Sequence, residues 1–168
     1  VELEQTAFFP EGGGQAADTG RLGSAAVLDV QEEEGIIWHY TNRPLEPGDT
    51  VRGEIDWPVR FRRMQNHTGE HIVSGIIHRE FGLNNMGFHM GTDGITVDFD
   101  GVLTWEELRR VEYSANAAVA ANVPVTAVYP PAEELADMDY RSKLNLTENV
   151  RIVTIEGYDV CACCAPHV

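Results

Sequence analysis

Two pairs of potential metal-binding side chains occur in this chain, each with a spacing of four residues. His67 and His71 lie in the segment HTGEH, and Cys163 and His167 lie in the C-terminal segment CCAPH. Residues four apart on a helix project from the same face, so His67 and His71 can share one metal ion. A histidine pair of this kind also occurs in packing or capping roles, and by itself it is a modest signal.

The terminal pair strengthens the metal hypothesis because it adds a thiolate and a third imidazole. Zinc binds such ligands in a tetrahedron and accepts ligand pairs from distant parts of a chain. We therefore predict a Zn²⁺ site on His67, His71, Cys163 and His167, with Cys161 and Cys164 as alternative thiolate ligands. Four protein ligands are typical of a structural site, so catalysis would require an exchangeable ligand or an expanded coordination sphere.

The segment HTGEH also fits the zinc-protease pattern H-x-x-E-H, in which Glu70 would activate a water molecule. Glu148 could complete that ligand set, but this interpretation leaves the terminal cysteine-histidine pair unexplained. In a protease of this kind, Glu70→Gln should abolish activity. The alternative interpretation of Glu70 is a solvent-facing helix residue with good helix propensity.

The histidine pair is predicted to lie on one long helix. Asp56, Trp57 and Pro58 are typical of a helix start, with an acidic cap and a proline in the first turn, and Gly82 predicts its end. Between these signals, apolar residues recur at helical spacing and predict one buried stripe, made of Ile72, Val73, Ile76, Ile77 and Phe81.

The remaining C-terminal sequence alternates between strand and helix signals. Thr104 and Glu107 form a capping-box pattern before a helix over 105–121. Further predicted elements are strands at 94–99, 123–129 and 150–155 and a short helix at 131–138. These elements predict an α+β fold in which residues 56–168 form a two-layer α/β sandwich with an antiparallel sheet.

Residues 1–55 are predicted to form a small β module of their own. Short β-type runs occur at 25–30, 36–40 and 50–55, among many glycines and prolines. Because the sequence starts at Val1 in a strand-like stretch, we expect a trimmed, partial β-barrel-like module. The glycine-rich segment at 6–15, TAFFPEGGGQ, lacks the lysine of a phosphate-binding loop and by itself predicts a turn between strands.

The composition argues against broad, non-specific nucleic-acid binding. Twelve Lys and Arg against 27 Asp and Glu give a net charge of −15, which repels a phosphate backbone. The dense cationic cluster of Arg60, Arg62 and Arg63 could contact RNA locally or could be a solvated helix turn. No apolar run approaches the ~20 residues of a membrane span, and no leader is evident. We therefore expect a soluble, cytoplasmic protein.

Four segments taken in order resemble the alanyl-tRNA editing family. They are TAFFPEGGGQAADTG, NHTGEHIVSGIIHREFG, GFHMGTDGITVDFD and YDVCACCAPHV. The family includes free-standing AlaX-type proteins and the editing domain of alanyl-tRNA synthetase, with a related domain in threonyl-tRNA synthetase. The resemblance covers nearly the whole chain, and its motif combination is specific.

The resemblance implies a β-barrel-like N-terminal module on an α/β editing domain, with Zn²⁺ held by the four residues predicted above. It implies an aminoacyl-tRNA deacylase that hydrolyses the ester on tRNA(Ala) mischarged with serine or glycine. It also implies that the glycine-rich loop lies over the active site and contacts substrate through Gly12, Gly13, Gly14 and Gln15. Thr68 and His89 are weaker candidates for catalytic contact with the substrate.

Several positions depart from the family pattern. Ala16 stands where a proline is usual, and CCAPH replaces the common CGGTH, with Pro166 as in the threonyl version CRGPH. These departures leave the preferred amino acid open. Two rival functions also remain: an editing domain acting in cis within a full synthetase, and a non-catalytic zinc-stabilised RNA-binding module. The editing hypothesis predicts only a mild effect of Glu70→Gln.

Overall fold

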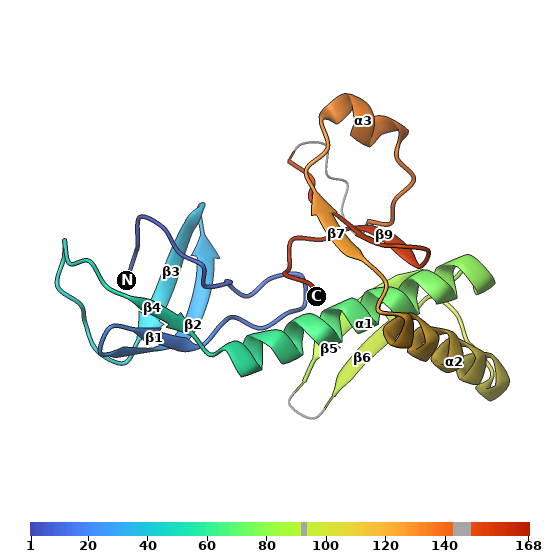
Figure 1. Cartoon of the computed structure of the whole chain (residues 1–168), viewed down its shortest axis with the longest axis horizontal. Coiled ribbons are helices and arrows are strands. Elements are labelled where there is room, and N and C mark those ends of the chain that lie inside the picture. Colours follow the sequence, from blue (N-terminus) through green and yellow to red (C-terminus); the bar gives the residue numbers. More distant parts are fainter. Residues whose placement is uncertain (92–93, 143–148) are drawn as a thin grey trace.

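The computed structural model describes residues 1–91, 94–142 and 149–168. The chain is α+β, as predicted, and every pairing between its named strands in these ranges is antiparallel. The long helix α1 (Trp57–Phe81) runs through the middle of the molecule, with one sheet at its N-terminal end and the remaining elements around its C-terminal half (Figure 1). In the described residues, no helix combines the length and apolar character needed to cross a membrane.

The N-terminal sheet is open. It contains β1 (Gly20–Leu22), β2 (Ala25–Glu33), β3 (Ile36–Thr41) and β4 (Gly53–Ile55) in the order β3-β2-β1-β4. The predicted barrel-like closure is not confirmed, because the edge strands β3 and β4 do not pair with each other. Its small core is made of Phe8, Ala17, Leu22, Val27 and Val30.

The helix α1 begins and ends where the sequence predicts, although its first residue is capped differently. The Asp56 side chain makes no capping hydrogen bond; its backbone oxygen accepts from the N–H groups of Val59 and Arg60 instead. Gly82 ends the helix in the left-handed conformation, with φ of 68°, and its N–H donates to the His78 oxygen at 2.9 Å. Glycine adopts this conformation without a steric penalty.

The predicted apolar stripe of α1 is buried against α2 (Trp105–Ala121) and β8 (Ile152–Ile155). Its central residue, Ile76, is fully buried. The predicted capping box is confirmed, because the Glu107 N–H donates to the Thr104 hydroxyl and the Glu107 carboxylate accepts the Thr104 N–H at 2.7 Å. The stripe therefore leaves another face of α1, which carries His67 and His71, free to meet the C-terminal chain.

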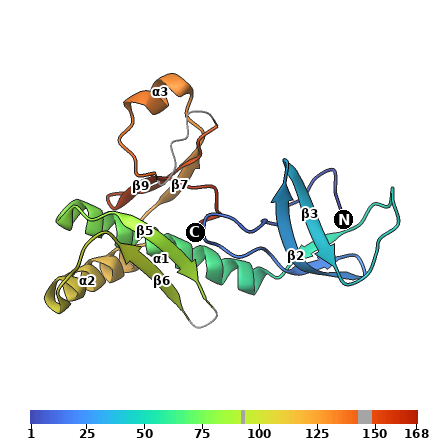
Figure 2. The same cartoon turned by 180° about the vertical axis from the view of Figure 1, so that it is seen from behind.

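The strands after α1 form two separate sheets. The strands β5 (Asn85–Met90) and β6 (Ile95–Phe99) form a hairpin. A three-stranded sheet has the order β7-β8-β9 and comprises β7 (Val125–Val128), β8 and β9 (Asp159–Ala162), with α3 (Ala132–Asp137) inserted between β7 and β8. Figure 2 shows the β5–β6 hairpin on the near side of α1. Helices thus pack against antiparallel sheets, but the strands do not form one continuous layer.

Two of the three clustered arginines attach the N-terminal module to α1. The Arg60 Nε donates to both carboxylate oxygens of the buried Asp18 at 2.8 and 2.9 Å. Arg63 donates to the Ala17 backbone oxygen. Only Arg62 is exposed, so the cluster is mainly structural: a buried carboxylate such as Asp18 needs a paired cation.

Candidate metal centre

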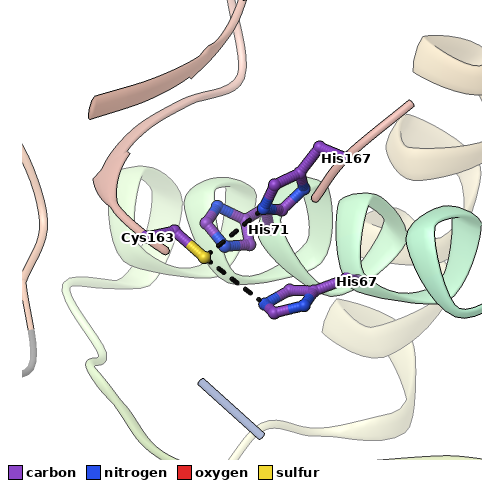
Figure 3. A group of neighbouring side chains, drawn as sticks. All are labelled: His67, His71, Cys163 and His167. Atoms are coloured by element: carbon purple, nitrogen blue, oxygen red, sulfur yellow. Dashed lines mark hydrogen bonds between the residues drawn. The ribbon is translucent and has the colours of Figure 1, made fainter. Parts of the chain in front are cut away.

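Helix α1 and the C-terminal loop bring the four predicted ligands to one point. Potential ligand atoms of His67, His71, Cys163 and His167 all lie within 4.8 Å of one another. Figure 3 shows His67 and His71 projecting from successive turns of α1, with the Cys163 sulfur between the imidazoles of His67 and His167. The two remote segments therefore meet as the metal hypothesis requires.

The distances within this cluster fit a tetrahedral zinc site. Zinc–nitrogen bonds of ~2.05 Å and zinc–sulfur bonds of ~2.3 Å put sulfur and nitrogen about 3.6 Å apart on the edge of a tetrahedron. The Cys163 Sγ lies 3.6 Å from His67 Nε2 and 3.4 Å from His167 Nε2. Both the donor types and their separations are thus suitable for one Zn²⁺ ion.

Each histidine of the cluster uses its second ring nitrogen for a hydrogen bond. The Nδ1 atoms of His67, His71 and His167 lie 3.1, 2.9 and 3.1 Å from Gln15 Oε1, Asp159 Oδ2 and Thr68 Oγ1, respectively. Amide and carboxylate oxygens only accept, so Nδ1 carries the proton of His67 and of His71. Nε2 of each then faces the cluster and can bind a metal, as is usual for metal-ligating histidines.

Two of the residues that hydrogen-bond to the histidines, Asp159 and Thr68, make further hydrogen bonds of their own. Arg141 binds both oxygens of Asp159, at 2.7 and 2.8 Å. The Thr68 hydroxyl also accepts the Val168 N–H at 3.2 Å. Arg151 Nη1 donates to the backbone oxygens of Cys163 and Ala165, at 2.9 and 2.8 Å, which fixes the terminal loop. The cluster is therefore supported on both the helix side and the loop side.

The geometry selects Cys163 among the three cysteines. Cys164 is exposed, and Cys161 is buried behind His71, next to Asp159. Burial raises the pKa of the Cys161 thiol to about 12, which disfavours a thiolate there. The Nδ1 of His71 on that side is already bonded to Asp159, whose charge Arg141 neutralises. Cys163 is thus the cysteine whose sulfur faces the three imidazoles, and it would bind Zn²⁺ as the thiolate ligand.

Asp159→Asn should weaken metal binding by roughly 10–100-fold, the usual effect of losing an outer-sphere partner. The charged acceptor that orients His71 is lost, and Arg141 loses its bidentate partner. Titration with a chromophoric zinc chelator measures the affinity. The exposed Asp137→Asn at the end of α3 is the control; an equal loss in both variants would contradict the role of Asp159.

Metal binding should strengthen as the pH rises. Burial lowers the pKa of His71, but hydrogen bonds to Asp159 and Cys163 outweigh it and raise the pKa to about 9 in the protein without a metal. His71 then holds a proton at neutral pH that a metal must displace. The apparent affinity should rise about tenfold per pH unit until the pH reaches that pKa. Chelator competition at several pH values measures it, and a flat profile would contradict this linkage.

His167 needs no such deprotonation. Burial and the neighbouring His71 and His67 lower its pKa to about 2, so the ring is neutral at every working pH. A neutral imidazole is the form that binds metals.

The glycine-rich segment forms a tight hairpin whose tip lies beside the cluster. Gly12 and Gln15 exchange backbone hydrogen bonds at 3.1 and 3.0 Å, and Gly13 and Gly14 between them have φ of 60° and 81°. Two successive positive φ angles are typical of a type I′ turn and favour glycine. A Cβ on Gly14 would lie 2.6 Å from the Phe88 ring, so the tip also needs glycine for space.

A cavity of about 480 Å³ opens between the hairpin tip, α1 and the terminal loop. Its lining includes His67, His71, Cys163, Gly13, Gly14, Glu70, Phe88 and Arg151. Gln15 is fully buried behind His67 and does not line the cavity. Of the predicted substrate contacts, Gly13 and Gly14 therefore line the cavity, Gly12 does not, and Gln15 lies against the predicted ligand His67.

Thr68 and His89, the two weaker candidates for catalytic contact with the substrate, lie in different places. Thr68 is buried and touches His167, so it can position a ligand. The structure does not bring His89 to the cluster, because its neighbour Phe88 faces the cavity and adjacent strand residues point to opposite faces. The His89 side chain is 74% exposed and lies 3.8 Å from Asp98.

Sequence reasoning missed the buried polar residues that surround the ligands. Asp159 and Arg141 carry no spacing signal relative to His71, and only the fold reveals them. Glu70, interpreted as solvent-facing, is 4% exposed. Its position in the pattern H-x-x-E-H was the sequence signal that could have indicated a place beside the metal site. Glu148 lies outside the residues that the structure describes.

Sequence similarity to known proteins identifies the family to which this chain belongs. Over its whole length, the chain is 33% identical to the alanyl-tRNA editing protein Aarsd1 of Rattus norvegicus. It is 36% and 38% identical to the alanine–tRNA ligases of Ignicoccus hospitalis and Natronomonas pharaonis, again over its whole length. The chain belongs to the alanyl-tRNA editing family. The family profile of the tRNA synthetases class II (A) also matches residues 1–59, the N-terminal sheet and the start of α1.

This member of the alanyl-tRNA editing family corresponds to only part of its longer relatives. The chain spans 42% of the rat editing protein and 20% and 19% of the two ligases. The matched region is the whole chain, so it includes the positions of the four cluster residues, the glycine-rich hairpin and the cavity beside them.

Proposed function

We propose that this chain is a zinc-dependent deacylase that hydrolyses the ester of tRNA(Ala) mischarged with serine or glycine. The observation that carries this proposal is the convergence of His67, His71, Cys163 and His167 at the edge of a cavity, which the first three residues line together with the glycine hairpin. Membership of the alanyl-tRNA editing family supports the choice of substrate. Hydrolysis of an aminoacyl ester is downhill and needs no ATP.

The chain's residues would hold and orient the reactants. His67, His71, Cys163 and His167 would hold Zn²⁺, with Gln15, Asp159 and Thr68 fixing their rings. A bound Zn²⁺ would supply an electrophile that binds the substrate's α-amino group or polarises a water molecule. Positioning and charge stabilisation are sufficient because the aminoacyl ester is already a reactive bond.

The two parts of the chain would contribute different components of the active site. Residues 1–55 would supply the hairpin that covers the cavity, and residues 56–168 the metal ligands. The glycines at the tip let backbone approach the aminoacyl group closely. A serine hydroxyl bonded in the cavity would distinguish serine from alanine far better than size alone could, because alanine would leave buried polar groups unpaired.

The proposal is tested with one preparation of the whole chain. Metal content is measured by atomic emission, and deacylation rates are measured on seryl-, glycyl- and alanyl-tRNA(Ala). We expect one zinc per chain and faster release of serine or glycine than of alanine. Metal-dependent stability without any deacylation would overturn the proposal in favour of a non-catalytic zinc-stabilised RNA-binding module. Activity on all three at equal rates would overturn the proofreading role.

The same chemistry would serve a free-standing editing protein or an editing domain within a ligase. Relatives of both kinds match the whole chain. The full gene separates these cases, since an aminoacylation domain upstream of these residues would make the protein a ligase that attaches alanine to tRNA(Ala). In either case we expect the reaction in the cytoplasm, where charged tRNA is used.

A further inference from the structure

Glu70 is a buried acid at the edge of the metal cluster that none of the roles above uses. It is only 4% exposed and lines the cavity. The interpretation of Glu70 as a solvent-facing helix residue is therefore wrong. A carboxylate buried in this way has a considerable desolvation cost, which must be offset by its contacts or tolerated for its function.

The two carboxylate oxygens of Glu70 have different surroundings. Oε1 accepts hydrogen bonds from the Ser74 hydroxyl, at 2.6 Å, and from the Asn85 amide nitrogen. The same amide nitrogen lies 3.0 Å from the Ser74 oxygen, so the three side chains form one network between α1 and β5. Two donors thus fix the orientation of the carboxylate through one oxygen.

The other oxygen is directed toward the ligands. Oε2 accepts no hydrogen bond from the described residues, and it lies 3.8 Å from His71 Nε2, the nitrogen that faces the cluster. A purely structural link between α1 and β5 would need only Oε1, and a neutral glutamine could provide it. The second oxygen is a fixed proton acceptor beside the metal site.

We propose that Glu70 is the general base of the hydrolysis, which presumes the deacylase function proposed above. Glu70 Oε2 takes a proton from a water molecule whose oxygen bonds to the ester carbonyl carbon, and the carbonyl π electrons move to the carbonyl oxygen. When the carbon–oxygen double bond re-forms, the bond to the ribose oxygen breaks. The ribose oxygen takes the proton from Glu70, which returns to carboxylate. The products are the free amino acid and tRNA with its terminal hydroxyl.

The test separates proton transfer from metal binding and from substrate binding. Glu70→Gln preserves the side-chain shape and an acceptor for Ser74 but removes the base. We expect single-turnover hydrolysis of seryl-tRNA(Ala) to fall by about 100-fold or more, within the usual range for a general base. This expectation replaces the mild effect predicted from the sequence, because Glu70 is buried beside the ligands. Zinc content should be unchanged. The Kd for a non-cleavable seryl-adenosine 3′-amide, measured by calorimetry, should stay within about threefold.

Each other outcome would overturn the assignment. Hydrolysis within about threefold of wild type would show that Glu70 moves no proton in the slow step. A parallel loss of amide binding would make Glu70 a substrate-binding group instead. If the wild-type chain deacylates none of the tested tRNAs, the proposed function fails, independently of Glu70.

Two further variants complete the design. Glu80 lies on the same helix but outside the cavity. Glu80→Gln changes the net charge by the same amount as Glu70→Gln and should keep wild-type hydrolysis. Should Glu70→Gln lose zinc or fail to fold, Glu70→Asp retains the charge but withdraws the carboxylate by one methylene. Glu70→Asp should keep zinc and lose most of its hydrolysis, and full activity would refute the base.

Discussion

Replacing Cys163 with alanine is expected to remove bound zinc and the hydrolysis of seryl-tRNA(Ala) together. Its sulfur lies at tetrahedral-edge distances from two imidazole nitrogens. As a zinc-bound thiolate it would supply the negative charge of the ligand set. The loss of this ligand should weaken metal binding by more than the roughly 100-fold typical of losing an outer-sphere partner.

Thermal unfolding provides a second measurement of the same loss. Zinc at 1,000 times its Kd should stabilise the wild-type chain by about 4 kcal/mol, which corresponds to roughly 8–16 °C in Tm for a domain of this size. Cys163→Ala should lose this zinc-dependent shift, whereas the exposed neighbour variant Cys164→Ala should retain it. A Cys163→Ala variant that hydrolyses the ester without metal would refute the proposed arrangement.

Gly75→Ala is expected to disturb the metal centre from outside the ligand set. A Cβ at Gly75 would lie 2.3 Å from the Tyr158 backbone oxygen and 2.9 Å from the Asp159 Cβ. Real Cβ atoms do not approach so closely, so β9 would have to move away from α1. This movement separates Asp159 from His71, although alanine is intrinsically the better helix former by about 1 kcal/mol.

The net effect should combine lost stability with lost affinity. Overpacking costs about 1–3 kcal/mol, so we expect the urea midpoint to fall despite the gain in helix propensity. Zinc affinity should fall about 10–100-fold, because the second-sphere contact of His71 is displaced. The matched control is Gly69→Ala on the same helix, where a Cβ meets nothing within 4 Å, and it should stabilise the chain slightly. Unchanged zinc affinity in Gly75→Ala would contradict the close packing of β9 on α1.

The helices were predictable because their signals are local. Helical hydrogen bonds join residues four apart, so periodicity and end signals within one segment suffice. Gly82 and the Thr104–Glu107 capping box lie where the sequence indicated. The acidic cap at Asp56 was the exception, because the helix start is held by backbone contacts instead.

The short strands were not predictable in the same way. The sequence reading missed β1, β5 and β9, which have three, six and four residues. The strand β5 contains Asn85 and Gly87, residues that disfavour strands, and pairing with β6 decides its conformation. Strand pairing joins remote residues, so propensity within the segment gives little information.

The candidate site also combines features set by local sequence with features set by long-range packing. By itself, the sequence determined that His67 and His71 share a helix face and that a cysteine-histidine pair with the same spacing stands near residue 168, because both are statements about local spacing. Only the tertiary structure decided that Cys163 faces the cluster, that Glu70 is buried and that His89 points away. These depend on how β9 and the terminal loop pack on α1 across almost 100 residues of chain. Packing of that kind is set by shape and burial summed over many residues, which no motif records.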